Sequence, residues 1–334
     1  MKSVAEAPAS GKRIIVRCDF DVPVEGGTVV DESRVKNTLG TLRFLLDEKA
    51  KLVLIAHIGR PEKPDKGLSL VLVKKTLEGS LKREVSFQDK LAINERAPIN
   101  LLENLRFWPE EEENNRDFAK KLASFGEAYV NECFATSHRS HASIVSIAKF
   151  LPSFAGFNLI KEIEELGKIL QSPARPLVAI IGGAKLETKL PVIYNLAKVA
   201  DRVLVGGRLM FEADRRSLPE NVVVAHDDID AKDIGEGSVQ IFREVIKQAK
   251  MIVWNGPMGV FEEPKYINGT RQLANSVIAS GGYSVVGGGD TISALNKFGL
   301  TDKIDFISTG GGAMLEFLAG KTLPGIEALN SSRL

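Results

Sequence analysis

The chain has 334 residues, of which 44% are hydrophobic and 26% are charged, an ordinary composition for a soluble globular protein. Its formal net charge of +1 supplies no global field that would attract nucleic acid or a membrane surface, so we expect neither as a partner. The length exceeds what one hydrophobic core normally holds, which predicts two domains.

Short β-branched runs alternate with longer amphipathic segments along the whole chain. In the first half, strands are predicted at Ile14–Val16, Leu52–Ala56 and Tyr129–Val130, and helices at Ser33–Lys49 and Asp117–Phe125. An amphipathic connector, Phe157–Leu170, follows. In the second half, strands are predicted at Leu177–Ile181, Val203–Val205, Val222–Ala225, Met251–Trp254, Tyr283–Val286 and Ile304–Ser308. Helices are predicted there at Glu187–Val199, Val239–Lys250 and Thr270–Ser280.

This alternation predicts the α/β class, with two doubly wound parallel-sheet (Rossmann-like) domains joined by a hinge helix. The predicted boundaries are 1–156 for the N-terminal domain, 157–170 for the hinge helix and 171–320 for the C-terminal domain. A C-terminal segment, 321–334, could return to the N-terminal domain. Ligands of such sheets bind beyond the carboxyl ends of the strands, so the residues that follow each strand are the candidates for a site.

The second half is rich in glycine at these positions. Residues 157–334 contain 21 glycines, whereas residues 1–156 contain 9. Glycine clusters follow five of the six strands predicted in this half, namely Gly182-Gly183, Gly206-Gly207, Asn255-Gly256, Gly287-Gly288-Gly289 and Gly310-Gly311-Gly312. One glycine is ordinary in a strand-to-helix turn, but five clusters indicate backbone that approaches a polyphosphate closely.

The first half instead places cationic and histidine side chains after its strands. They are Arg34, His57, Arg60, Arg106, His138, Arg139 and His141. Each arginine alone would be interpreted as a solvated or structural group. Together, at equivalent places in the predicted topology, they indicate a pocket for a small anion that carries phosphate and carboxylate groups.

Simpler signatures are missing from the chain. No G-x-x-x-x-G-K-[ST] loop occurs, because position 315, ahead of Gly320-Lys321-Thr322, is leucine. The absence of G-x-G-x-x-G weighs against a dinucleotide dehydrogenase. Cys133, His138 and His141 lack an evident fourth ligand, so we do not predict zinc there.

Several motifs in a fixed order resemble the phosphoglycerate kinase family from about Val16 to Leu329. In the first half they are Arg17-Cys18-Asp19-Phe20-Asp21-Val22-Pro23, His57-Ile58-Gly59-Arg60-Pro61, Glu103-Asn104-Leu105-Arg106-Phe107 and His138-Arg139-Ser140-His141-Ala142-Ser143. In the second half they are Gly182-Gly183-Ala184-Lys185, Trp254-Asn255-Gly256-Pro257-Met258-Gly259-Val260-Phe261-Glu262, Gly287-Gly288-Gly289-Asp290-Thr291 and Ser308-Thr309-Gly310-Gly311-Gly312.

The resemblance implies a role for each matching residue. The substrate-binding residues would be Asp19, Phe20, Asp21, Arg34, His57, Ile58, Gly59, Arg60, Arg106 and Arg139. The nucleotide-binding residues would be Lys185, Lys189, Asn255, Glu262, Gly288, Gly289, Asp290 and Thr291, with Asp290 as the ligand of Mg²⁺. The catalytic residues would be Arg34, Lys185, Lys189, Gly311 and Gly312.

The activity that the resemblance implies is reversible phosphoryl transfer from 1,3-bisphosphoglycerate to ADP, which yields 3-phosphoglycerate and ATP after domain closure. The alternative is a degenerate phosphoglycerate-binding or regulatory protein without kinase activity. Cys18 and Cys133 are too few for a disulfide framework, and Met1–Lys12 lacks a signal-peptide core, so we expect a cytoplasmic protein. We expect a monomer rather than an oligomer.

The sequence departs from the family pattern at three places. The family usually has asparagine where Asp21 stands. Glu132-Cys133 and Ala135 replace the usual Asp-Ala and Gly. Only 25 residues separate Gly207 from Asp233, a stretch that is much longer in the family and builds part of its adenine pocket. Arg208 to Pro219, with Leu209, Met210, Phe211, Arg215 and Arg216, would supply at most a small, partly basic replacement.

Overall fold

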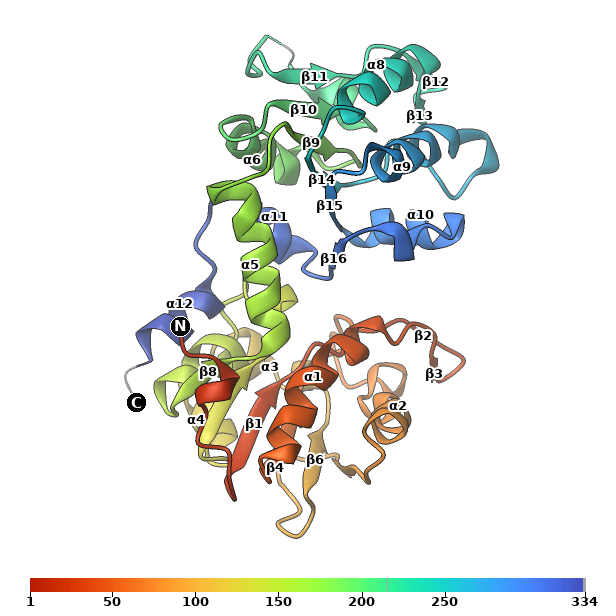
Figure 1. Cartoon of the computed structure of the whole chain (residues 1–334). Coiled ribbons are helices and arrows are strands. Elements are labelled where there is room, and N and C mark those ends of the chain that lie inside the picture. Colours follow the sequence, from red (N-terminus) through yellow and green to blue (C-terminus); the bar gives the residue numbers. More distant parts are fainter. Residues whose placement is uncertain (215, 333–334) are drawn as a thin grey trace. The chain divides into compact units, whose positions relative to one another are not determined.

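The computed structural model describes residues 1–214 and 216–332; Arg215 of the predicted replacement and positions 333–334 of the predicted C-terminal segment lie outside it. The chain forms two compact units (Figure 1). The first comprises Met1–Lys161 together with the stretch from Thr322 onward, and the second comprises Glu162–Lys321. Helix α5 (Phe157–Gln171) contributes residues to both.

The first unit is built on a parallel sheet of six strands in the order β5-β6-β4-β1-β7-β8. These strands are β1 (Arg13–Arg17), β4 (Lys51–Ile55), β5 (Ser86–Gln88), β6 (Ile99–Leu102), β7 (Ala128–Asn131) and β8 (Ser153–Ala155). A small antiparallel pair, β2 (Val24–Glu25) and β3 (Thr28–Val29), follows β1 in the chain.

Helices cover both faces of this sheet. Helices α1 (Ser33–Asp47) and α2 (Val71–Leu81) bury Leu42 and Leu77 against Ile14 of β1. Since neighbouring residues of a strand face opposite ways, Ile15 and Arg17 point to the other face. That face carries α3 (Pro109–Glu112), α4 (Arg116–Ala123), the π-helical turn η5 (Ala142–Ser146) and α12 (Pro324–Ser331). The 3-10 turns of the unit are η1 (Val4–Glu6), η2 (Lys66–Leu68), η3 (Leu105–Phe107), η4 (Phe134–Thr136) and η6 (Ile147–Lys149).

The second unit has its own six-stranded parallel sheet, in the order β11-β10-β9-β14-β15-β16. The strands are β9 (Leu177–Ile181), β10 (Arg202–Val205), β11 (Val222–Val224), β14 (Met251–Asn255), β15 (Tyr283–Gly287) and β16 (Phe306–Ser308). Counted along the chain, this is the 3-2-1-4-5-6 order of dinucleotide-binding folds, whose ligand crevice lies where the order reverses. Here that point lies between β9 and β14.

One face of the second sheet is covered by α8 (Glu236–Ile246) and α9 (Asn268–Ser280) (Figure 1). Phe242 of α8 and Leu273 of α9 belong to the same buried hydrophobic cluster as Trp254 of β14. The remaining helices are α6 (Leu186–Ala197), α7 (Leu209–Glu212), α10 (Gly289–Phe298) and α11 (Gly312–Leu318), with turns η7 (Pro264–Tyr266) and η8 (Thr301–Lys303). A hairpin of β12 (Asp228–Ile229) and β13 (Asp233–Ile234) follows β11.

The predicted α/β class and its two parallel sheets are confirmed, but several of the predicted helix boundaries were wrong and some strands were missed. Among the elements missed are β5, β6 and β8, because runs of three or four residues carry little periodicity. The first helix ends at Asp47 rather than Lys49, since Lys49 adopts a left-handed φ of 65°. The helix predicted from Val239 begins at Glu236, directly after Gly235. Within the described residues, no helix combines the length and apolarity needed to cross a membrane.

Candidate active site

In the first unit, the ends of β1 and β4 bring the predicted acid-binding residues together. Asp19 follows β1 and is almost fully buried. Arg34, in the first turn of α1, donates from Nη1 to both carboxylate oxygens of Asp19, at 2.9 and 2.8 Å. The Asp19 carboxylate raises the pKa of Arg34 above its usual value, so the guanidinium stays charged. A permanent cation is thereby held at the carboxyl edge of the sheet.

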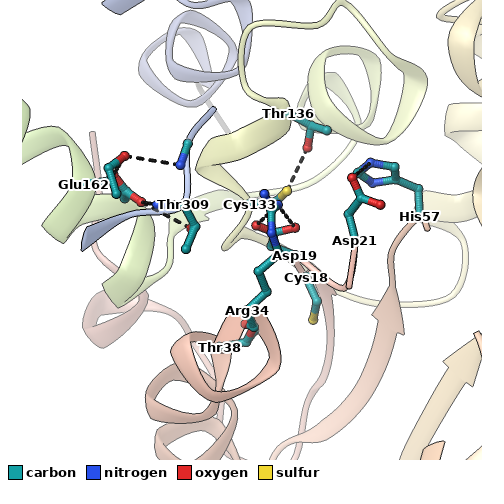
Figure 2. Close-up of polar contacts among 12 residues, drawn as sticks. Cys18, Asp19, Asp21, Arg34, Thr38, His57, Cys133, Thr136, Glu162 and Thr309 are labelled. Carbon is teal, nitrogen blue, oxygen red and sulfur yellow. Dashed lines mark hydrogen bonds and ion pairs between the residues drawn. The ribbon is translucent and has the colours of Figure 1, made fainter. Parts of the chain in front are cut away.

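Asp21 lies directly beside His57 (Figure 2). One carboxylate oxygen accepts a hydrogen bond from the Gly59 backbone N–H at 2.8 Å, and the other lies 3.7 Å from Nε2 of His57. Gly59 has a φ of 64°, and a Cβ there would come within 2.7 Å of the Leu68 side chain, so the turn requires glycine. The Asp21 side chain is 40% exposed, so its charge is accessible from solvent.

The remaining predicted residues of this unit divide into three groups. Arg106 donates to the Gly59 carbonyl at 2.6 Å and forms an ion pair with Glu112 at 3.0 Å, and burial lowers its pKa. The side chains of Phe20 and Ile58 are buried in the hydrophobic core. Arg60 and Arg139 have exposed side chains, without an ion pair to any described residue.

We expect Asp21→Asn to tighten 3-phosphoglycerate binding by about three- to tenfold, up to roughly 1.4 kcal/mol. The Asp21 carboxylate repels an anionic ligand, while an asparagine oxygen could still accept the Gly59 N–H. Isothermal titration of both forms at pH 7 measures the change. Equal affinities in the two forms at every pH from 5 to 8 would show that the Asp21 charge does not face the ligand.

In the second unit, backbone segments approach each other closely at the switch point of the sheet. A Cβ on Gly182 would lie 2.3 Å from the Pro257 carbonyl oxygen, and one on Gly256 would lie 2.1 Å from that of Gly182. Gly207, with a φ of 63°, packs against the backbone of Gly183. Any side chain here would separate the turns that follow β9, β10 and β14. The glycine clusters thus form a continuous backbone surface suited to a polyphosphate.

A hydrogen bond joins the side chains of Lys189 and Asn255 next to these glycine turns. Lys189 is on α6 and nearly buried, and its ammonium donates a hydrogen bond to Oδ1 of Asn255, the last residue of β14. Burial lowers the pKa of Lys189 from 10.5 to about 8, and the carboxylate of Asp290 partly opposes that shift. Lys185 immediately precedes α6, and its side chain is exposed.

The first turn of α10 carries the last group of predicted nucleotide ligands. Gly288 has a φ of 97° and precedes Gly289, the first residue of the helix. Asp290 is exposed in that first turn, whereas Thr291 is buried and accepts a hydrogen bond from the Gly256 N–H at 2.7 Å. Thr291 therefore joins the turns after β14 and β15 rather than facing solvent.

The turn after β16 is held by Glu162, which our sequence analysis missed. One Glu162 oxygen accepts a hydrogen bond from the Ser308 hydroxyl at 2.7 Å, and the other accepts one from the Thr309 N–H at 2.9 Å (Figure 2). Gly311 follows with a φ of 50°, and α11 starts at Gly312. Nothing in the local sequence marked Glu162, because it lies 146 positions from Ser308.

A cavity of about 350 Å³ lies beside these turns. Its lining includes Gly183 and Gly207, the carboxylates of Glu262 and Asp290, and two cations, Arg208 and Lys232. The ammonium of Lys232 pairs with Glu263 at 2.9 Å. Of the predicted nucleotide ligands, the cavity lining thus includes Glu262 and Asp290, which follow β14 and β15 along the chain.

The short connection between Gly207 and Asp233 contains α7, β11 and β12. Leu209 and Met210 of α7 are buried in the unit, whereas Phe211 is 49% exposed. Leu209 and Met210 are therefore committed to the interior, and Phe211 is the exposed apolar side chain of α7.

Comparison with known proteins places the chain in a family. The family model for phosphoglycerate kinase matches residues 4–214 and 211–321. The phosphoglycerate kinase of Rubrobacter xylanophilus is 41% identical over 384 residues, covering 98% of each chain. That of Dictyoglomus turgidum is 39% identical over 378 residues, covering 96% of each. The solved phosphoglycerate kinase of Coxiella burnetii matches with a TM-score of 0.85 at 33% identity, covering 98% of each chain.

These alignments also bear on the shortened segment. An alignment of 378 residues is longer than the 334-residue chain, so that relative carries residues without a counterpart here. The family match is divided at 211–214, inside the stretch between Gly207 and Asp233. Full-length matches to named kinases support the kinase over a binding protein that has lost its activity. The chain belongs to the phosphoglycerate kinase family.

Proposed function

We propose that this protein transfers a phosphoryl group reversibly between 1,3-bisphosphoglycerate and ADP, giving 3-phosphoglycerate and ATP, with a carboxyl group as the acceptor in the reverse direction. The observation that carries the proposal is the chemical difference between the two sets of strand ends. Those of the first unit carry Arg34, His57 and Arg106, whereas those of the second carry glycine turns and Lys189.

The first unit would bind the three-carbon acid. Arg34, Arg106 and the exposed Arg60 and Arg139 supply cations for its phosphate and carboxylate. His57 and the Gly59 turn lie beside them. Asp19 keeps Arg34 oriented and charged, because Nη1 of Arg34 donates to both oxygens of the Asp19 carboxylate.

The second unit would bind the nucleotide. Lys185 and Lys189 would contact its phosphates, and the Gly288–Gly289 backbone would lie against those phosphates. Glu262 would accept hydrogen bonds from the ribose hydroxyls. The described residues contain no group of three or more metal-ligating side chains. Asp290, one of the two exposed carboxylates in the cavity lining, fits a magnesium ion that arrives with the phosphates, since Mg²⁺ commonly takes one or two carboxylates plus phosphate oxygens. That ion would neutralise phosphate charge.

Phosphoryl transfer needs in-line positioning and neutralisation of charge on the equatorial oxygens rather than a covalent protein intermediate. Arg34, Lys189 and the backbone amides at Gly311 and Gly312 would supply that charge. Because the two ligands would bind separate units, transfer requires a hinge motion that brings them together. We further propose a cytoplasmic monomer, consistent with two cysteines that are both free and buried.

A coupled assay with 1,3-bisphosphoglycerate against ADP, GDP and pyrophosphate tests the proposal. We expect ATP formation with a kcat in the usual range for kinases, about 1–100 s⁻¹ or above. Turnover with pyrophosphate alone would assign a different phosphoryl acceptor. Binding of 3-phosphoglycerate without any turnover would restore the alternative of a binding protein.

Replacing Asp290 by alanine is expected to weaken Mg-ADP binding by about tenfold or more while 3-phosphoglycerate binding changes by less than about twofold, since Asp290 lies among the nucleotide turns. Separate calorimetric titrations with each ligand measure both constants. Asp302→Ala, on a turn of the same unit, is the control. Equal losses for the two ligands would contradict the division of labour between the units.

The shortened segment predicts weak base discrimination, with ADP and GDP Michaelis constants within about tenfold, roughly 1.4 kcal/mol. A base is held mainly by apolar walls. In the shortened segment Leu209 and Met210 are buried and Arg208 and Lys232 line the cavity, so the large apolar residues of the cavity lining, Pro257, Val260 and Phe261, come from outside that segment. Phosphate contacts lie elsewhere, so turnover should persist with both nucleotides. A preference of a hundredfold or more for one base in steady-state kinetics would show that a selective wall exists.

A further inference from the structure

Arg17 is the last residue of β1, and its guanidinium is fully buried although the proposed substrate contacts do not use it. All three of its nitrogens have partners. Nε donates to the Ser143 hydroxyl at 2.8 Å, Nη1 donates to the Cys18 carbonyl at 2.7 Å, and Nη2 lies 3.1 Å from Nδ1 of His57. Burying a guanidinium costs free energy even when its donors have partners, because the charge loses its hydration. A buried arginine at this position therefore suggests a specific role.

Glu111 supplies the opposite charge through Ser143. Glu111 is on α3 and fully buried, and its two oxygens accept hydrogen bonds from the Ser143 N–H at 2.9 Å and the Ser143 hydroxyl at 2.5 Å. The Ser143 hydroxyl therefore donates to Glu111 and accepts from Arg17. Burial raises the pKa of Glu111, whereas the Arg17 cation and the two Ser143 hydrogen bonds lower it. The net pKa of Glu111 is raised, and the Ser143 hydroxyl forms a hydrogen-bonded bridge between the Glu111 carboxyl group and Arg17.

This bridge determines where the proton of His57 resides. An arginine is always protonated, so Nη2 of Arg17 donates and Nδ1 of His57 must accept. The single ring proton is then on Nε2, the nitrogen that lies 3.7 Å from Asp21. A protonated ring would set an N–H against the Arg17 N–H. The other charged or titratable groups that act on the ring are Arg34, Arg106 and His141.

We propose that Arg17 is a positioning residue, held by Ser143 and Glu111, which keeps His57 as a neutral Nε2–H donor to an oxyanion of the phosphoglycerate. The inference rests on the proposed function for the substrate. His57 is buried, and its surroundings lower its pKa, which agrees with a neutral ring. A neutral ring with one fixed N–H donor would orient the bound oxyanion, whereas the arginines around the ring would neutralise the charge of that oxyanion.

Nitrogen-15 NMR of histidine-labelled full-length protein tests the tautomer directly. The chain has four histidines, so a His57→Gln spectrum assigns the signal of His57. We expect the wild-type ring to be the Nε2–H form at pH 7. An Nδ1–H form or an imidazolium in the wild-type protein would overturn the inference without any variant at the bridge.

Two variants then break the bridge. Ser143→Ala removes the hydroxyl between Arg17 and Glu111, and Arg17→Lys keeps the charge but cannot reach the same three acceptors. Ser69→Ala is the matched control. The Ser69 hydroxyl also donates to a glutamate, Glu103, at 2.6 Å, and Glu103 also accepts a neighbouring backbone N–H, that of Leu70, at 2.8 Å. That pair is in the same unit and has no arginine bonded to its serine.

We expect both bridge variants to show a mixture of His57 tautomers and to bind 3-phosphoglycerate about tenfold more weakly, with the Kd for Mg-ADP within about twofold of wild type. Ser69→Ala should keep the wild-type His57 signal. Unchanged tautomers in whichever variants fold would overturn the inference, as would altered tautomers with unchanged 3-phosphoglycerate affinity. In either case, wild-type turnover in the coupled assay would leave the proposed function standing. If the wild-type protein showed no turnover, both the proposed function and the inference about Arg17 would fail.

Discussion

Arg34→Ala is expected to lower kcat by about 10² or more, corresponding to roughly 2.7 kcal/mol of lost transition-state stabilisation. The guanidinium is oriented by two contacts with Asp19 and kept charged by it, so it is ready to neutralise phosphoryl oxygens without reorganisation. The kcat for ATP formation at saturating ligand measures the loss. Near-normal turnover in a folded Arg34→Ala protein would show that this cation does not act in the transition state.

Stability needs a control, because the variant leaves the buried Asp19 carboxylate without its ion pair. Arg34→Lys keeps a charge next to Asp19 but loses the planar guanidinium. We therefore expect Arg34→Lys to have a melting temperature nearer that of the wild-type protein and still to lose about tenfold in kcat. If both variants lost activity only in proportion to the fraction unfolded, the effect would belong to the fold rather than to the reaction.

Lys189→Ala is expected to lower kcat by a similar factor of about 10² or more. Its ammonium is nearly buried and hydrogen-bonded to Asn255, so its charge acts where solvent screening is weak. Lys198→Ala, at the opposite end of α6, is the control for loss of a lysine on that helix. Equal turnover of Lys189→Ala and wild type would contradict the assignment.

The pKa of Lys189 predicts the pH profile of the same step. Burial lowers that pKa to about 8, so the free protein loses the ammonium charge as the pH rises through this value. The kcat/KM for Mg-ADP should therefore fall above pH of about 8, since this parameter reports ionisations of the free enzyme. In Lys189→Arg, the decline should disappear because a guanidinium stays protonated. A decline that persists in Lys189→Arg would belong to another group.

Much of the architecture could be predicted from local patterns. The alternation of β-branched runs with amphipathic segments predicted two parallel sheets. The continuous apolar runs indicate strands buried on both faces, and the amphipathic segments indicate the helices that cover those faces. The motifs around Asp19, His57, Lys185 and Asn255 were also local, so their order along the chain was enough to indicate the family. The short strand β5 (Ser86–Gln88) was missed because its pairing with β6, rather than its own residues, makes it a strand.

The sequence by itself thus determined the fold class, the family and the kinds of side chain at each strand end. Only the tertiary structure decided which of those side chains meet. Arg17 was one letter of a recognised motif, but Ser143 lies 126 positions away and Lys189 lies 66 positions from Asn255. The physical reason is that such contacts depend on the register of parallel strands and on which sheet face a helix covers. Both are set by pairing between strands that lie far apart in the sequence, and the residues next to each position along the chain do not indicate that pairing.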